Sequence, residues 1–323
     1  MRISTYLIIL LSLLFVACAS GEKDPNETTQ MEKEPSTRPS QQDTPSSMTP
    51  STSNTIDSVS TTTNSTSTCQ ATSNSENNFN DSFIENKHND IATLFDAYSS
   101  ISVSEIAQTF NHARDNDPTI SKHLTMPTQT KWDNMSASQQ ALFLINDERC
   151  ARRIRPFEGI EPKIVNNVAK AYANYIAAND ADFVQNPHEA DGRTPWERLT
   201  QDANVRVNTN ADFFGYGENL AYHSVASSLN YPATVHETTA KSVYGWMYED
   251  KSSRYGHRLF ILSTNLIENS GDKKVEGLIG VATSKTNYTT TSSGRTFYWT
   301  KIHTVLNGFD PNENWDMSNV IYK

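Results

Sequence analysis

Two stretches near the C-terminus, VEGLIGVAT at 275–283 and RTFYWTKIHTV at 295–305, decide the fold class of this chain. The first is rich in glycine and β-branched residues, and the second alternates aromatic with polar residues. Both patterns are typical of β-strands. The polar stretch SKTNYTTTSSG at 284–294 lies between them, and it predicts a loop that joins the two strands as antiparallel neighbours.

Helix signals dominate the region that precedes these strands. Ser136 and Gln139 form a capping-box pattern, in which a hydroxyl and a carboxamide satisfy the first free amides of a helix. Thr194 and Glu197 repeat the pattern around a proline at the first helical position. GYGENLAY at 215–222 predicts a short strand. Because helices come first and strands follow with few crossovers, we predict an α+β domain with helices packed on an antiparallel sheet. The predicted helices span about 136–150, 164–181, 194–199 and 234–249.

Residues 1–18 are typical of an export signal, with an apolar core from Leu7 to Val16. Phe15-Val16-Ala17-Cys18 resembles the lipobox of bacterial lipoproteins, in which the cysteine is lipidated and becomes the mature N-terminus. We therefore expect lipidation at Cys18 and a protein anchored in the cell envelope, surface-exposed or extracellular, in the outer membrane if the cell has one. An ordinary cleaved signal peptide is the alternative. The apolar run is too short for a comfortable membrane span.

A tether is expected to follow the signal. From Ala19 to about Asn78 the chain is dominated by Ser, Thr, Pro and Gln, so it cannot bury enough apolar surface to offset the entropy of ordering. Residues 19–78 are therefore predicted to be a disordered stalk. In a mucin-like eukaryotic protein the same composition would indicate a glycosylated stalk with a sequon at Asn26. Apolar residues at helical spacing predict a helical extension at 79–130, ahead of the main domain at 131–323.

The charge and the cysteines narrow the range of partners. The 323 residues carry a formal net charge of −10. Because no Lys/Arg-rich stripe stands out to neutralise phosphates, we expect no nucleic-acid partner. With Cys18 in the signal, Cys69 and Cys150 form a candidate disulfide between stalk and domain in an oxidising compartment. Two unpaired thiols are the alternative.

Four residues stand where turns and predicted elements meet, and these could carry chemistry. They are a loop histidine, the acid of a Gly-Glu-Asn turn, the acid that ends the tryptophan-bearing helix, and a histidine before an apolar run: His188, Glu218, Glu249 and His257. Two imidazoles and two carboxylates are what a divalent-metal site or an acid–base pair needs. The sequence has no G-x-S-x-G elbow, no phosphate-binding glycine loop, no paired C-x-x-C and no H-E-x-x-H pattern.

Five motifs that occur in one order connect these residues to a known family. They are LINDER at 144–149, HEADGRTPWERL at 188–199, GENLA at 217–221, GWMYED at 245–250 and YGHRLFIL at 255–262. They are similar to the family's first-helix pattern, bacterial histidine motif, G-E-N box, tryptophan helix and G-H-R box. Through them residues 139–305 resemble the CAP superfamily, the SCP-like domains related to cysteine-rich secretory proteins, antigen 5 and plant pathogenesis-related proteins.

The resemblance implies a fold and a site. The family fold is a three-layer α-β-α sandwich with a central antiparallel sheet. The family's cleft collects two histidines and two acids, which carry over onto His188, Glu218, Glu249 and His257. Trp246 and Glu249 keep the W-x-x-E spacing of the animal and plant members. Neutral imidazoles bind zinc readily, so His188 and His257 are the candidate ligands of zinc or another divalent cation, with the carboxylates outside them.

The expected function is that of a surface-anchored CAP-domain lipoprotein that works as a binding module. Its partners would be the membrane, through the lipid anchor, and an unidentified lipid, sterol or protein ligand that the resemblance implies. Two other interpretations stay open. The four residues could form a buried cluster that only fixes the cleft walls, or they could serve a secreted metal-dependent hydrolase or protease. We assign no catalytic residue, because no nucleophile stands beside either histidine in the sequence.

Overall fold

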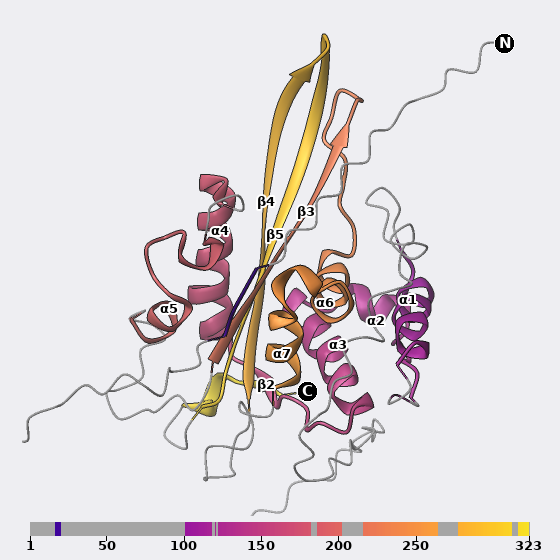
Figure 1. Ribbon diagram of the computed structural model, residues 1–323, viewed down its shortest axis with the longest axis vertical. Coiled ribbons are helices and arrows are strands. Elements are labelled where there is room, and N and C mark those ends of the chain that lie inside the picture. The colour runs from indigo at the N-terminus through magenta and orange to yellow at the C-terminus, as the bar shows by residue number, and fades with distance from the viewer. Residues whose placement is uncertain are drawn as a thin grey trace, which may run out of the picture. The chain divides into compact units, whose positions relative to one another are not determined.

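The structure, a computed structural model, describes residues 17–20, 101–117, 120, 122–181, 186–201, 216–263, 277–311 and 316–322. These residues have an α+β fold, as the sequence predicts, with strands in the order β1-β3-β5-β4-β2-β6 and helices beside them (Figure 1). The strands are β1 (Ala17–Ser20), β2 (Gly159–Ile160), β3 (Tyr216–Ser227), β4 (Leu278–Ser292), β5 (Arg295–Phe309) and β6 (Ile321–Tyr322). The α-helices are α1 (Val103–Asp115), α2 (Gln129–Asp133), α3 (Ala137–Ala151), α4 (Lys170–Asn179), α5 (Pro195–Gln201), α6 (Thr238–Tyr248) and α7 (Gly256–Leu262). Shorter helical turns are η3 (Ile164–Ala169), η5 (Pro187–Glu189), η6 (Lys251–Ser253) and η7 (Met317–Asn319).

The two C-terminal strands are antiparallel neighbours, which confirms the prediction, but the predicted loop between them is wrong. β4 and β5 stay paired as far as Ser292 opposite Arg295, so most of 284–294 is strand. Its threonines are β-branched and suit an extended backbone. Only Ser293 and Gly294 form the turn, with φ of 49° and 72°, and left-handed pairs of this kind match the twist of hairpin strands.

The sheet is mixed, whereas we predicted an antiparallel one. β3 pairs antiparallel with β5 along its whole length. The short strand β2 instead runs parallel to β4, with Gly159 opposite Leu278. Gly159 has no room for a side chain, because a Cβ atom would lie 2.8 Å from Val320. β2 contains two residues, so the parallel pairing is short.

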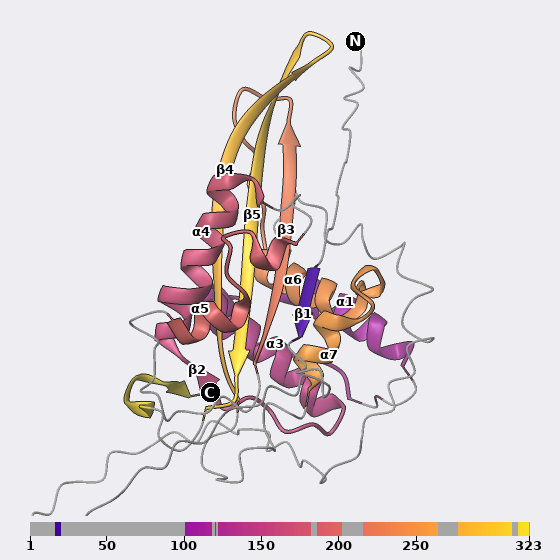
Figure 2. The same cartoon turned by 60° about the vertical axis from the view of Figure 1, so that its left-hand side comes forward.

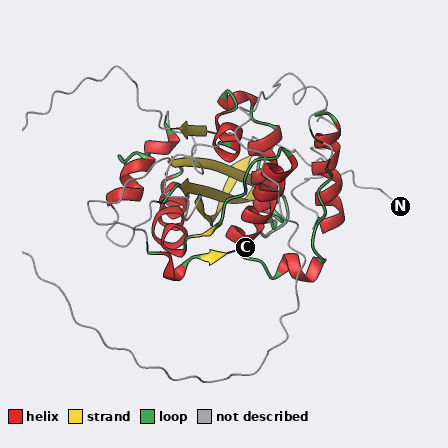
Figure 3. Cartoon of the chain, turned by 90° about the horizontal axis from the view of Figure 1, so that it is seen from below, coloured by secondary structure: helices red, strands yellow, loops and turns green. Residues whose placement is uncertain are grey.

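Helices cover both faces of the sheet. Leu220 of β3 packs against Tyr172 and Ile176 of α4 on one face. Its neighbour Ala221 belongs to the core on the other face, which contains Leu144 of α3 and Trp246 of α6. This alternation follows from the pleat of a strand, in which successive side chains point to opposite faces. Viewed from below, the helices lie on either side of the strands (Figure 3).

The helical segment predicted ahead of the main domain is partly described, as α1 and α2. Ile106 and Phe110 of α1 and Trp132 of α2 are fully buried in the same core as α3 and α6. Arg114 of α1 also bonds Glu148 of α3, through Nε at 3.0 Å and Nη2 at 2.7 Å. α1 and α2 thus complete the core, and residues 79–100 lie outside the described residues.

The helix-start signals are confirmed where they are local. Gln139 N–H donates to Ser136 Oγ at 3.3 Å, and Ser136 N–H donates to Gln139 Oε1 at 2.9 Å, so the capping box forms. The helix predicted from 234 begins later, at Thr238, because Glu237 takes a left-handed φ of 51° and accepts a bond from Trp132 Nε1 at 2.9 Å. The π-helical turn η3 precedes α4, which ends at Asp180 in the left-handed region.

Parts of the N-terminal predictions fall on described residues. Ala19 and Ser20, predicted as the start of the stalk, lie instead in β1 together with Cys18. Residues 1–16 of the predicted signal, the stalk from 21 to 78, and Cys69 lie outside the described residues. Cys150 is disulfide-bonded, and its pairing with Cys69 stays a prediction. None of the described helices is long and apolar enough to cross a bilayer.

Candidate functional site

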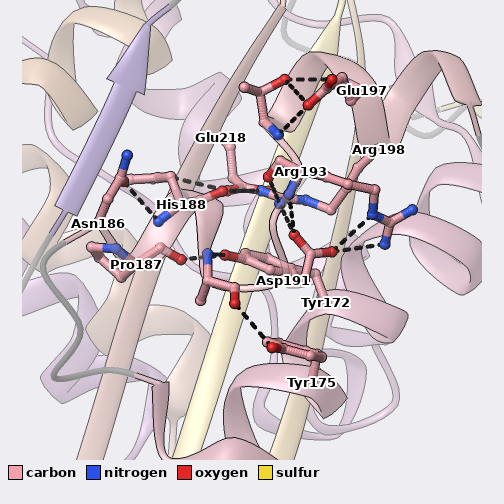
Figure 4. A network of polar contacts seen from close by, with 12 residues as sticks. Tyr172, Tyr175, Asn186, Pro187, His188, Asp191, Arg193, Glu197, Arg198 and Glu218 are labelled. Atoms are coloured by element: carbon pink, nitrogen blue, oxygen red, sulfur yellow. Dashed lines mark hydrogen bonds and ion pairs between the residues drawn. The ribbon is translucent and has the colours of Figure 1, made fainter.

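His188 is held by the turn η5, immediately after α4. Asn186 Oδ1 accepts a bond from His188 N–H at 3.2 Å and so caps the turn. The phenol of Tyr172, on α4, donates to Pro187 O and accepts from Ala190 N–H at 3.2 Å. Burial raises the pKa of Tyr172, which keeps its proton available for this bond. The histidine backbone is therefore fixed from both sides (Figure 4).

Glu218 is the centre of the site. This fully buried carboxylate lies on β3. Its Oε1 accepts from His188 Nδ1 at 2.9 Å and its Oε2 from Asn307 Nδ2 at 3.0 Å. Arg198 Nη2 donates to both oxygens, at 2.7 and 2.9 Å. A buried charge is tolerated only when it is paired and hydrogen-bonded, and Glu218 meets both conditions.

Arg198, on α5, joins the site to its loop. Besides Glu218 it donates to His188 O at 2.7 Å and Asp191 Oδ1 at 2.9 Å, and its guanidinium lies 3.4 Å from the centroid of the Tyr172 ring. Burial acts to lower the pKa of Arg198, but Glu218 and Asp191 outweigh burial and raise it. The arginine is therefore a charged structural tie between α4, α5 and β3.

The position of one proton follows from this geometry. A carboxylate only accepts hydrogen bonds, so His188 Nδ1 carries the hydrogen that faces Glu218. In its neutral form the ring then presents a lone pair at Nε2. That atom is buried, and it has no hydrogen-bond partner among the described residues. Asn307 also bonds Glu218, and its Oδ1 is likewise buried without a hydrogen bond to any described residue.

His257 sits in a separate network, and the acid beside it is Asp250, which is not one of the four predicted residues. Its Nδ1 bonds Asp250 Oδ1 and lies 3.0 Å from Ser253 Oγ. Arg258 N–H donates to Asp250 Oδ2 at 2.9 Å. His257 is fully buried and has further interactions. This histidine therefore holds together the turn η6 and the start of α7.

The two histidines approach β3 from opposite faces. Glu218 points to the face of α4 and α5, where it meets His188. The next side chain, Asn219, points to the other face, where its Nδ2 donates to His257 O at 3.1 Å. In the described part of the chain, the structure thus unites His188 with Glu218 but not with His257. No group of three His, Cys, Asp or Glu side chains is placed to hold a metal among the described residues.

Glu249, the fourth predicted member, follows the end of α6. Its carboxyl is half-buried, and burial raises its pKa. Its side chain makes no hydrogen bond or ion pair with another described residue. Asp250, one position further, takes the place beside His257 that the W-x-x-E spacing suggested for Glu249.

Two site residues had no signal in the sequence. Asn307 lies directly opposite Glu218 in the register of β3 and β5, and such a register is set by the fold. Asp191 lies within the histidine motif and accepts a hydrogen bond from Arg198, a role that the motif alone does not predict. Comparison with protein families, curated proteins and solved structures finds no match for this chain.

Proposed function

We propose that this protein is a CAP-like binding module of the cell envelope, anchored by a lipid on Cys18, and that its ligand contacts His188 Nε2. The order of the five sequence motifs supports the family. Helices on both faces of a mainly antiparallel sheet are consistent with the three-layer sandwich of that family. The buried, unpartnered Nε2 of His188 is the observation that carries the binding site.

The chemistry of the site defines the ligand class. A lone pair at His188 Nε2 accepts a hydrogen bond or binds a cation, and Asn307 Oδ1 offers a second lone pair beside the same carboxylate. Leaving such atoms buried without a partner costs free energy, about 1–3 kcal/mol each, which a ligand recovers by supplying a donor. A lipid or sterol hydroxyl, a peptide N–H group and a divalent cation all meet this requirement.

Zinc fits the described residues only in part. One imidazole nitrogen and one amide oxygen are open, whereas His257 Nδ1 already bonds Asp250. Structural zinc sites use four protein ligands and catalytic ones three. Zinc binding by His188 and His257 together therefore stays a proposal that rests on the family resemblance, and Glu218 would orient His188 in it.

A hydrolase is the alternative. His188 and Glu218 have the geometry of a general base and the acid that orients it. In the described part of the chain, however, no serine, threonine or cysteine bonds His188 Nε2. Hydrolysis at this site would therefore depend on a water molecule activated by His188. The test is to incubate the full chain with a library of peptides and esters. Turnover that is lost in His188→Ala would favour the hydrolase over the binding module.

Zinc titration of the full chain tests the site, with His257→Ala as the matched control for His188→Ala. Each variant removes one buried imidazole, so circular dichroism and melting temperature show whether both stay folded. A site at His188 predicts that zinc heat disappears in His188→Ala and persists in His257→Ala. Loss of the zinc-binding heat in both folded variants would instead indicate a zinc site that uses both His188 and His257. Pelleting with phosphatidylcholine vesicles, with and without cholesterol, tests the hydroxyl ligand in the same pair of variants.

A further inference from the structure

The edge of β3 next to His188 carries an extended segment from the N-terminal part of the same chain. β1 pairs antiparallel with Gly217–Leu220, with Cys18 opposite Asn219 and Ala19 opposite Glu218. It lies against η5 and α7, the two elements that bear His188 and His257. Figure 2 shows β1 at the edge of the sheet, and Figure 4 shows its ribbon passing beside Asn186 and His188.

This edge needs a partner strand. β3 has 12 residues and is paired with β5 along all of them, but on its other side the described part of the chain pairs with Gly217–Leu220 alone. Those four residues are buried with β1 in place. Buried backbone N–H and C=O groups must be hydrogen-bonded, and an uncovered strand edge therefore accepts any extended chain that fits.

The segment that fills the edge is short and weakly held. β1 has four residues, Ala-Cys-Ala-Ser, so it supplies few ladder hydrogen bonds. It is joined to α1 by a long stretch of chain, whose closure costs conformational entropy that grows slowly with length. Because few hydrogen bonds oppose this entropy cost, β1 can leave the edge of β3 without unfolding the sheet.

We propose that Ala17–Ser20 is a detachable cap on the β3 edge beside the His188–Glu218 pair. When paired, it closes the edge. When it leaves, the same edge binds an extended polypeptide with small side chains by backbone pairing, as other exposed sheet edges do. The proposal rests on strand pairing alone, and it stands whether or not His188 binds a ligand.

Processing of the N-terminus would decide whether the cap is kept. Cleavage before Cys18, as in the lipoprotein proposed above, leaves Cys18–Ser20 on the chain. The cap would then hold the lipid anchor against the domain. Cleavage after Ala19, at the A-x-A pattern of an ordinary signal peptide, would remove the strand and leave the edge open.

A proline scan of the full chain, read by amide hydrogen exchange, tests the cap. In an antiparallel pair, alternate residues direct their N–H groups to the neighbouring strand, and proline has none. Ala19→Pro and Ser20→Pro are therefore matched variants of opposite phase. One of them should speed exchange of the β1-facing amides of 217–220 by about ten-fold, and the other by less than about two-fold. The β5-facing amides of the same residues are the internal control.

The variant that releases the cap should bind a labelled peptide of residues 15–24, FVACASGEKD, about ten-fold more tightly than the wild-type chain, measured by fluorescence anisotropy. Equal exchange in both proline variants, or equal peptide affinity in released and wild-type chains, overturns the proposal. Protection at 217–220 that rises with protein concentration also overturns it, because the strand would then come from a second copy.

Discussion

Two buried glutamates, Glu148 and Glu218, have their carboxylate charges compensated by different sets of partners. Glu148 on α3 lies between Arg114 and Arg152, and Tyr248 donates to it at 2.6 Å. Glu218 has one arginine, one amide and the imidazole of His188, whose second nitrogen has no hydrogen-bond partner among the residues that the structure describes. The first network only joins helices, whereas the second leaves a reactive atom in a buried place. The difference distinguishes a structural ion cluster from the place where we propose that a ligand binds.

The largest expected effect is on the Glu148 network. Glu148→Ala removes the carboxylate that the two buried arginines share and leaves Arg114 with Asp147 at 2.8 Å and Arg152 with Asp117 at 3.9 Å, so it should reduce the free energy of unfolding by about 3 kcal/mol. Urea denaturation of the full chain measures this. Arg155→Ala is the control, because Arg155 and Glu158 are partly exposed, and it should cost at most about 1 kcal/mol. Similar losses in both variants would refute the contrast between buried and exposed pairs.

The pH dependence of stability follows from the same network. Burial acts to raise the pKa of Glu148, but Arg114, Arg152 and the Tyr248 bond outweigh it and lower the pKa. A carboxyl with a lowered folded-state pKa contributes stability above its unfolded pKa of about 4.3, and this contribution is lost as pH falls through the folded-state pKa. Acid unfolding curves should therefore be steeper for the wild type than for Glu148→Gln below about pH 4.3. Parallel curves would show that other carboxyl groups control acid unfolding.

Glu218→Gln should weaken both stability and binding. A glutamine leaves Asp191 as the charged partner of Arg198 among the described residues, and we expect a loss of about 2 kcal/mol in urea denaturation. It also turns a pure acceptor into a group that can donate to His188 Nδ1, which moves the ring hydrogen to Nε2. Nitrogen-15 NMR of the imidazole reads this tautomer directly. An unchanged His188 spectrum would show that Glu218 does not determine the tautomer of His188.

His257→Ala should destabilise the protein more than His188→Ala. His257→Ala removes the imidazole that bonds Asp250, a buried acid, and should cost about 2 kcal/mol of stability. His188→Ala leaves Glu218 with Arg198 and Asn307 and should cost about 1 kcal/mol. Thermal unfolding ranks the two. A larger loss for His188→Ala would make His188 the structural histidine.

Glu249→Gln should have the smallest effect, and of the opposite sign. Burial raises the pKa of Glu249, so its ionised form opposes folding once pH exceeds its unfolded pKa, and the penalty is complete above the folded-state pKa. At pH 7 the glutamine variant should be more stable by about 1 kcal/mol or less. At pH 4 the Glu249 carboxyl is mostly protonated in both the folded and the unfolded protein, so the gain in stability should be smaller there. Destabilisation at pH 7 would reveal a partner for the carboxylate.

Local features were predictable and long-range ones were not. The capping boxes at Ser136 and Thr194 formed as predicted, because each needs only residues three positions apart. The helix α7 was not predicted, because the apolar run LFIL at 259–262 is compatible with a buried strand as well as a helix and is too short to show a period. The turn before it uses left-handed Arg254 and Tyr255, whereas the glycine that follows is helical.

The sequence by itself determined the α+β class, the two C-terminal strands and the capped helices, and it singled out His188 and Glu218 as candidates. The fold closes their separation of 30 positions to one hydrogen bond. Only the tertiary structure decided which acid serves which histidine. Asp250 and Glu249 are adjacent, and strand register alone places Asn307 against Glu218. Local bonds depend on spacing along the chain, but pairing across a sheet depends on register and on which face each residue takes.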